Sequence, residues 1–231
     1  MSIWSSISKL IASLISGASL SSVFERLKTP PERTVGFTIA VIALSAKMAK
    51  ADGAVTHNEI IAFKQIFQIP IHEEENALNV FKLAQKDVAG FEFYAKQIAR
   101  MLKNNKKLLE DLIEGLLHIS MADGIYHNNE NMYINRVAEI FGISLTVLKT
   151  LKARYIPGNR KDPYLVLGVT KNSSYKEIKN HWKKLVYESH PDNIIARGLP
   201  QEAINLANSR LISINAAWEE IKILLTDAKK S

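Results

Sequence analysis

The chain has 231 residues, of which 47% are hydrophobic and 23% charged; this is the balance of a globular protein with one large or two small domains, and it excludes global disorder. The absence of cysteine excludes disulfides, thiolate metal sites and cysteine nucleophiles, and it fits a reducing compartment. The net charge of +7 is spread along the chain without a dense basic run interleaved with aromatics, so we expect an acidic protein partner rather than nucleic acid.

The N-terminal segment, residues 1–28, is predicted to contain an amphipathic helix over residues 3–20. Serines occupy one face, and the other face carries Ile3, Ile7, Leu10, Ile11, Leu14 and Ile15. Lys9 and the serines make the segment too polar to span a bilayer, which needs about 20 predominantly apolar residues. Two interpretations stay open: the segment attaches to a membrane surface or a partner helix, or it packs on its own domain.

Residues 34–155 are predicted to form a helical domain between linkers at residues 29–31 and 157–160. The stretch 34–46 carries no charge and almost no polar face, which indicates a buried core helix. Further helices are expected at residues 60–69, 72–86, 91–103, 108–122, 132–141 and 145–154.

This domain contains an internal repeat, in which an apolar helix ends in Ala-Asp-Gly and a glutamate follows in the next helix. The acidic residues of the two copies are Asp52, Glu59, Asp123 and Glu130. One interpretation is capping, because glycine suits a helix C-terminus and a glutamate in a first turn complements the helix dipole. The alternative is a site for a metal cation or a cationic ligand, formed if the two copies meet around a pseudo-twofold axis.

Residues 160–231 carry the most distinctive pattern. The run 175–187 predicts a helix whose apolar face is formed by Ile178, Trp182, Leu185 and Val186. Other faces carry Lys176, Lys179, Lys183 and Lys184. His190-Pro191-Asp192 ends this helix, because proline disfavours helical geometry in the residue before it. A second long helix is expected from about residue 201 to 225, antiparallel to the first and joined to it by a polar loop.

This pattern resembles the J domain of DnaJ-type co-chaperones. The resemblance includes a short first helix at residues 162–169, residues 182–186, the His-Pro-Asp tripeptide and residues 214–221. Residues 193–200 narrow it to the DjlA-like branch. Two departures are Asn193, where many J domains carry lysine, and the absence of a basic cluster near the end of the third helix.

The preceding region resembles the TerB-like domain of the same family, through residues 91–97 and 138–143. The resemblance implies an all-α fold: an N-terminal amphipathic segment, a TerB-like helical bundle at 34–155, and at 160–231 a J-domain helical hairpin with a short flanking helix. DjlA-like proteins are held at the bacterial inner membrane by their N-terminus. The resemblance therefore implies a cytoplasmic protein attached to that membrane, and dimerisation through the N-terminal segment is compatible with it.

The resemblance also implies roles for residues. In J domains the His-Pro-Asp loop and the basic face of the preceding helix dock on a DnaK-type chaperone and accelerate its ATP hydrolysis. By position, His190, Pro191 and Asp192 would be the activation loop. The contact face would be Lys176, Lys179, Lys183 and Lys184. The alternatives are a plain turn and a solvated helix face.

No catalytic motif accompanies these residues: the sequence has no Gly-rich phosphate loop, no His-Glu-x-x-His and no Gly-x-Ser-x-Gly. We therefore expect a non-enzymatic co-chaperone without a cofactor, whose TerB-like domain supplies location or client choice. Two alternatives stay open. In one, the helical domain senses a metal or ligand and the J domain is its output; in the other, the protein is a membrane scaffold with a J-like interaction module.

Overall fold

The computed structural model describes residues 6–7, 32–52, 61, 64, 69, 71–86, 90–156, 162–200 and 204–227, with side chains of residues 35–48 in the first long helix. The predicted linkers, most of the N-terminal segment, Gly53, Glu59 and the side chain of Asp52 lie outside the described residues. The all-α prediction is confirmed, since the described elements are helices without a strand.

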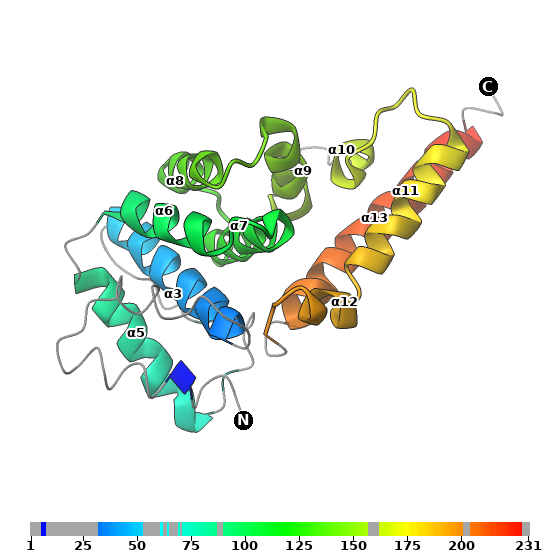
Figure 1. Cartoon of the computed structure of the whole chain (residues 1–231). Helices are drawn as coiled ribbons and strands as arrows, with labels where there is room; N and C mark the ends of the chain where they lie inside the picture. Colours follow the sequence, from blue (N-terminus) through cyan, green and yellow to red (C-terminus); the bar gives the residue numbers. More distant parts are fainter. Residues whose placement is uncertain are drawn as a thin grey trace.

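Two groups of helices follow one another along the chain (Figure 1). The first, called the bundle here, consists of α3 (Glu32–Asp52), the 3-10 helix η1 (Ile71–Glu73), α5 (Glu74–Lys86), α6 (Phe91–Met101), α7 (Lys106–Ser120), α8 (Asn128–Ile140) and α9 (Leu145–Tyr155). The second, called the hairpin, consists of α10 (Pro163–Leu167), α11 (Tyr175–Glu188), α12 (Pro191–Ala196) and α13 (Ile204–Asp227).

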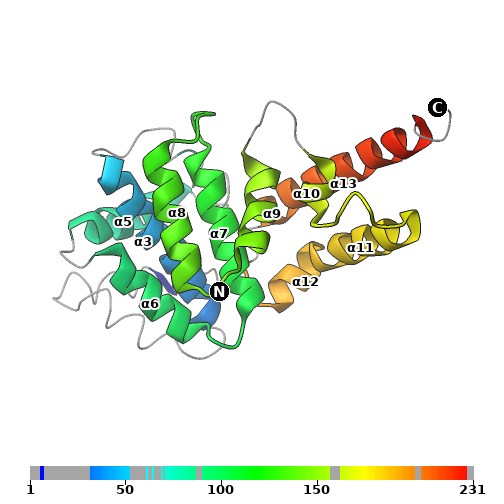
Figure 2. The ribbon, with the colours of Figure 1, turned by 90° about the horizontal axis from the view of Figure 1, so that it is seen from above.

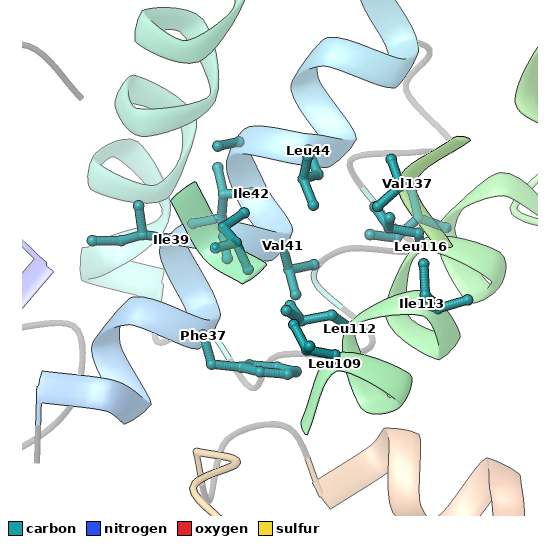
Figure 3. Packing of buried hydrophobic residues seen from close by; sticks show 14 of the residues in the cluster. Phe37, Ile39, Val41, Ile42, Leu44, Leu109, Leu112, Ile113, Leu116 and Val137 are labelled. Atoms are coloured by element: carbon teal, nitrogen blue, oxygen red, sulfur yellow. The ribbon is translucent and has the colours of Figure 1, made fainter. Parts of the chain in front are cut away.

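Helix α3 is the centre of the bundle, as the charge-free stretch 34–46 within it predicts. It is longer than expected, and its described side chains from Val35 to Met48 are all buried. Val41 of α3 faces Leu112 of α7 in the interior (Figure 3). Burial extends to Lys47, whose ammonium lies 5.3 Å from the centre of the Tyr94 ring, a cation–π contact that partly replaces its lost hydration. The bundle is therefore built around a helix with no solvent face over this stretch.

The two long helices of the hairpin, α11 and α13, lie antiparallel and side by side (Figures 1 and 2). Trp182 of α11 stacks on Trp218 of α13 with ring centroids 5.0 Å apart and planes at 11°. Short α10 ends at Gly168, which has a φ of +74°. A Cβ there would lie 3.4 Å from the Thr150 side chain of α9. Glycine therefore suits this position for two reasons: the backbone is left-handed, and the bundle approaches it closely.

Helix α12 differs from the expected polar loop. The sequence interpretation used Pro191 only to end the preceding helix. In the structure Pro191 also occupies the first turn of α12. Its fixed φ is helical, and no hydrogen bond is lost through its missing N–H, because the N–H groups of a first turn have no acceptor within the helix. His190 is the N-cap. The His-Pro-Asp tripeptide is thus a junction between two helices.

The end of the hairpin that carries α12 packs into the bundle. Ile194 of α12, Leu199 after it, and Leu206 and Ala207 of α13 are buried in the same apolar cluster as the bundle core. The far part of the hairpin has a separate core that includes Tyr164, Ile178, Leu185, Ile214 and Ile221. This arrangement places the His-Pro-Asp junction beside the bundle.

Candidate partner-binding site

A hydrogen bond between two of its own residues holds the His-Pro-Asp junction in shape. The backbone N–H of Asp192 donates to Nδ1 of His190 at 3.3 Å, which caps α12 and requires Nδ1 to be unprotonated. Nε2–H is then the imidazole donor left for a partner. The His190 side chain is 57% exposed and that of Asp192 is 87% exposed. The junction therefore offers one donor and one carboxylate to solvent from a fixed turn.

Two side chains stabilise this turn by donating hydrogen bonds to the last carbonyl groups of α11. Asn193 Nδ2 donates to the Tyr187 carbonyl at 2.7 Å, and Arg197 Nη1 donates to the Glu188 carbonyl, also at 2.7 Å. A helix C-terminus leaves such carbonyls without intrahelical partners, so these bonds stabilise the exit from α11. Asn193, one of the two departures from the J-domain pattern, has a structural role here.

The lysines named from the sequence are all exposed on α11. We call this surface the lysine face; it consists of Lys176, Lys179, Lys183 and Lys184. Ile178 and Leu185, on the other side of the helix, are buried in the hairpin core. Lys184 Nζ lies 3.7 Å from Oε1 of Glu188, the last residue of α11. The lysine face and the His-Pro-Asp junction thus belong to one helix and its exit turn.

Behind the junction lies a buried group of charges that sequence reasoning missed. We call it the ion cluster; it consists of Asp111 and Glu114 of α7, Arg154 of α9, Arg197 after α12 and Arg210 of α13. Asp111 is 0% exposed and Glu114 is 1% exposed.

The ion cluster is held by direct contacts between the bundle and the hairpin. Arg197 Nη2 lies 3.2 Å from Asp111 Oδ2, and Arg154 Nη1 lies 2.8 Å from Glu114 Oε1. Arg210 donates to both carboxylates. Because α7 and α13 contribute opposite charges, neither carboxylate is buried without a cation.

The electrostatics of the ion cluster favour the ionised carboxylate. Burial raises the pKa of Glu114, but the charges of Arg210 and Arg154 outweigh it, so the net effect is a lowered pKa. Burial also raises the pKa of Tyr155 well above its usual value, and its hydroxyl donates to Glu114 at 3.3 Å. Glu114 is thus an anion with three donors.

A signal for the ion cluster was present in the sequence. Asp111 and Glu114 lie three residues apart in the strongly apolar run 108–122, so they share one helix face that apolar neighbours surround. Carboxylates in such a run indicate buried partners, because an unpaired buried charge is too costly. The sequence could not identify which arginines those partners are.

Both acidic residues of the second copy of the repeat accept hydrogen bonds from backbone N–H groups. Asp123 accepts from the Ile125 N–H at 2.9 Å, a bond that lowers its pKa. Glu130 accepts from the His127 N–H at 2.8 Å within the capping box that begins α8, and Gly124 has a φ of +83°. The capping interpretation is therefore confirmed for Glu130. Gly124 does have a left-handed backbone, but it lies in the turn after α7, whose C-cap is Met121.

The cation-site hypothesis also involves the first copy, and Glu59 and the Asp52 side chain lie outside the described residues. Within the described part of the chain, no three His, Cys, Asp or Glu side chains gather in a way that could hold a metal ion. The four-carboxylate site stays a prediction.

Of the predicted N-terminal helix, only Ser6 and Ile7 are described. Both are helical, and Ile7 is fully buried in the bundle core. At Ile7 the structure supports packing on the protein's own domain. None of the described helices combines the length and the apolarity that crossing a membrane requires.

Comparison with known proteins gives two family matches. The model described as tellurite resistance protein TerB matches residues 38–153, and the DnaJ domain model matches residues 162–230. No solved structure matches the chain.

Curated relatives match across both regions. The Co-chaperone protein DjlA of Photobacterium profundum is 29% identical over 217 residues, covering 83% of this chain and 78% of that protein. The protein of the same name from Shewanella oneidensis is 26% identical over 221 residues, covering 89% and 83%. That from Coxiella burnetii is 26% identical over 195 residues, covering 76% and 72%. The chain belongs to the DjlA-like family of bacterial co-chaperones, in which a TerB domain is followed by a DnaJ domain.

Proposed function

We propose that this co-chaperone stimulates ATP hydrolysis by a DnaK-type chaperone through His190, Pro191 and Asp192, with the lysine face of α11 as the first point of contact. One observation carries the proposal: an exposed donor and an exposed carboxylate lie on a braced turn directly after a helix with exposed lysines. The function is regulatory: the partner catalyses the attack of water on ATP that breaks the bond between the β- and γ-phosphates and releases ADP and phosphate.

The geometry supports this role through preorganisation. The turn is held by the bonds to Tyr187 and Glu188, so little conformational entropy is lost when a partner binds it. Asp192 can accept from an arginine or a backbone donor of the partner, and His190 can donate through Nε2. The partner hydrolyses ATP faster only if these groups bind its hydrolysis-competent state more tightly than its resting state.

The lysine face acts earlier, during encounter. Exposed lysines attract an acidic surface from a distance, and this attraction raises the association rate more than the final affinity. Screening by salt weakens it. The proposed division is therefore steering by α11 and activation by the His-Pro-Asp junction.

The test is steady-state ATP hydrolysis by a bacterial DnaK-type chaperone with the full chain and with His190→Gln. We expect the variant to lose the stimulation and leave the partner at its basal rate, because the imidazole is removed from the exposed end of the junction. Its thermal unfolding should change little, since replacing a helix N-cap costs about 1 kcal/mol.

A matched control is His72→Gln, an exposed histidine on η1 in the bundle. This variant should stimulate like the wild type. Full stimulation by folded His190→Gln would refute the proposed function, and equal losses in both variants would show an effect unrelated to the junction.

For location, we propose two alternatives to be tested, and the amphipathic sequence of residues 3–20 supports the first, attachment to the cytoplasmic face of the inner membrane. The burial of Ile7 favours the alternative, in which this segment packs on the bundle. Sedimentation with anionic vesicles of the full chain and of a chain lacking residues 1–28 distinguishes the two. Homodimerisation through the same segment is tested by light scattering on both chains.

A further inference from the structure

The first turn of α7, in the TerB domain, lies against the C-terminal end of α12, the short helix that begins at the His-Pro-Asp junction. Asn105, the N-cap of α7, donates through Nδ2 to the Arg197 carbonyl at 2.8 Å. A Cβ at Gly198 would lie 3.6 Å from Leu108 Cδ2, so the backbone after α12 runs directly over this turn. The view in Figure 2 shows α12 beside the bundle at this end of the hairpin. Whatever docks on the junction therefore comes close to the loop between α6 and α7.

One carboxylate joins the lysine face to the TerB domain. Glu188 ends α11, and its Oε1 lies 3.7 Å from Lys184 Nζ of the lysine face. Its Oε2 lies 3.9 Å from Lys107 Nζ in the first turn of α7. A lysine from each domain thus lies close to the same carboxylate, that of Glu188.

The TerB side of this boundary is itself basic. The segment 103–107 reads Lys-Asn-Asn-Lys-Lys and contains no acidic residue. Lys103 and Lys106 are exposed, while Lys107 is half-buried and also pairs with Glu110 at 2.9 Å. The two exposed lysines are therefore available to a partner that approaches the junction.

The ion cluster fixes these lysines relative to the junction. Asp111 lies one turn beyond Lys107 on α7, and it binds both Arg197 and Arg210. Arg197 also donates to the Glu188 carbonyl at the end of α11. The Arg197 side chain thus connects the end of α11 to α7.

We propose that Lys103 and Lys106 of the TerB domain form a second part of the docking surface for the DnaK-type partner, at the start of α7 where it approaches the end of α11. The inference rests on the proposed function. The occupant is an acidic surface of the partner's ATPase, the same chemistry that the lysine face attracts. The TerB domain is in this way part of the co-chaperone's binding site and adds steering charge to it.

The test is the double variant Lys103→Glu and Lys106→Glu in the full chain, titrated against the partner ATPase at low and high ionic strength. We expect the concentration for half-maximal stimulation to rise on the order of tenfold at low salt, because two attractions become repulsions at the rim of the interface. The maximal rate at saturation should stay that of the wild type, since the junction is unchanged. High salt should shrink the difference.

The matched control is Lys82→Glu with Lys86→Glu. Both lysines are exposed on α5, which lies on the side of α3 turned away from α12, and the change in net charge is the same (Figure 1). These substitutions should leave the titration as in the wild type. An equal shift in this control would overturn the inference, because it would reduce the effect to net charge.

Three further outcomes are decisive. If the wild type itself gives no stimulation, the proposed function fails. If the wild type stimulates and the Lys103→Glu, Lys106→Glu variant titrates identically, only the second docking surface is refuted. A variant that loses maximal rate without a shift in half-maximal concentration would also refute docking.

The milder pair Lys103→Gln and Lys106→Gln should shift the titration in the same direction by less, which separates a charge effect from misfolding.

Discussion

At the residue scale, the ion cluster is the feature that most depends on exact partners. Two carboxylates of α7 have no access to water, and the guanidinium groups of Arg154, Arg197 and Arg210 replace their hydration. Such a group is not by itself evidence of high stability, because the desolvation of all its charges offsets the attraction. Removing only one partner of the ion cluster is costly in stability, because it leaves a buried charge without a counter-charge.

We predict that Arg210→Met lowers the free energy of unfolding by about 3–5 kcal/mol, because it leaves two buried carboxylates without the cation they share. Methionine retains much of the side-chain volume, so the loss reports charge rather than a cavity. Urea unfolding followed by circular dichroism measures it.

The control for this substitution is Arg136→Met, which breaks exposed pairs with Glu92 and Glu139. Exposed pairs are screened and hydrated, so this variant should lose much less stability. Equal losses in the two variants would contradict the assigned burial of the ion cluster.

At the scale of elements, the helices begin where capping side chains permit. Ser174 and Glu177 form a capping box at the start of α11, and Ser144 caps α9 through the Val147 N–H. Asn105 has two roles: its Oδ1 accepts from the Leu108 N–H at 3.1 Å, and its Nδ2 reaches the Arg197 carbonyl. A single amide thus begins α7 and attaches the exit of α12 to it.

This double role gives a prediction for α7. Asn105→Ala should cost about 2 kcal/mol in unfolding free energy, because it removes both a cap and a hydrogen bond between the domains. Ser144→Ala removes a cap alone and should cost about 1 kcal/mol. Asn105→Asp should fall between the two, since the carboxylate still accepts from Leu108 but cannot donate to Arg197. Denaturant titration of the three variants checks the order, and a loss in Asn105→Ala no greater than that in Ser144→Ala would contradict it.

At the scale of the whole molecule, the two domains do not have wholly separate interiors. Ile194, Leu199, Leu206 and Ala207 belong to the hairpin in the chain and to the bundle core in space. The ion cluster lies across the same contact. Separating the domains would expose apolar side chains and buried charges together.

We therefore predict that the full chain unfolds in one cooperative transition with a shared midpoint for both domains. Differential scanning calorimetry, with calorimetric and van't Hoff enthalpies compared, measures this. Arg210→Met should split or broaden the transition, because it weakens the contact that couples the domains. Two resolved transitions in the wild type would show that the coupling is weak.

Much of this architecture could be predicted from local sequence. The helical periods, the Gly124 turn, the first-turn position of Glu130 and the burial of Ile178 and Leu185 all depend on spacings within a few residues. The same holds for the His-Pro-Asp tripeptide and the lysines on α11. Helix α12 was missed, because Pro191 was used as the end of one helix and not as the start of another.

By itself the sequence determined the kinds of element, their order and the composition of the junction, because helix formation and capping are decided among neighbours in the chain. Only the tertiary structure decided that Arg154 meets Glu114 across 40 residues and that Arg210 meets Asp111 across 99. A buried ion pair depends on which helix faces pack together, and no local spacing records that. For the same reason, only the fold shows that Lys107 of the TerB domain lies 3.9 Å from Glu188, at the end of α11.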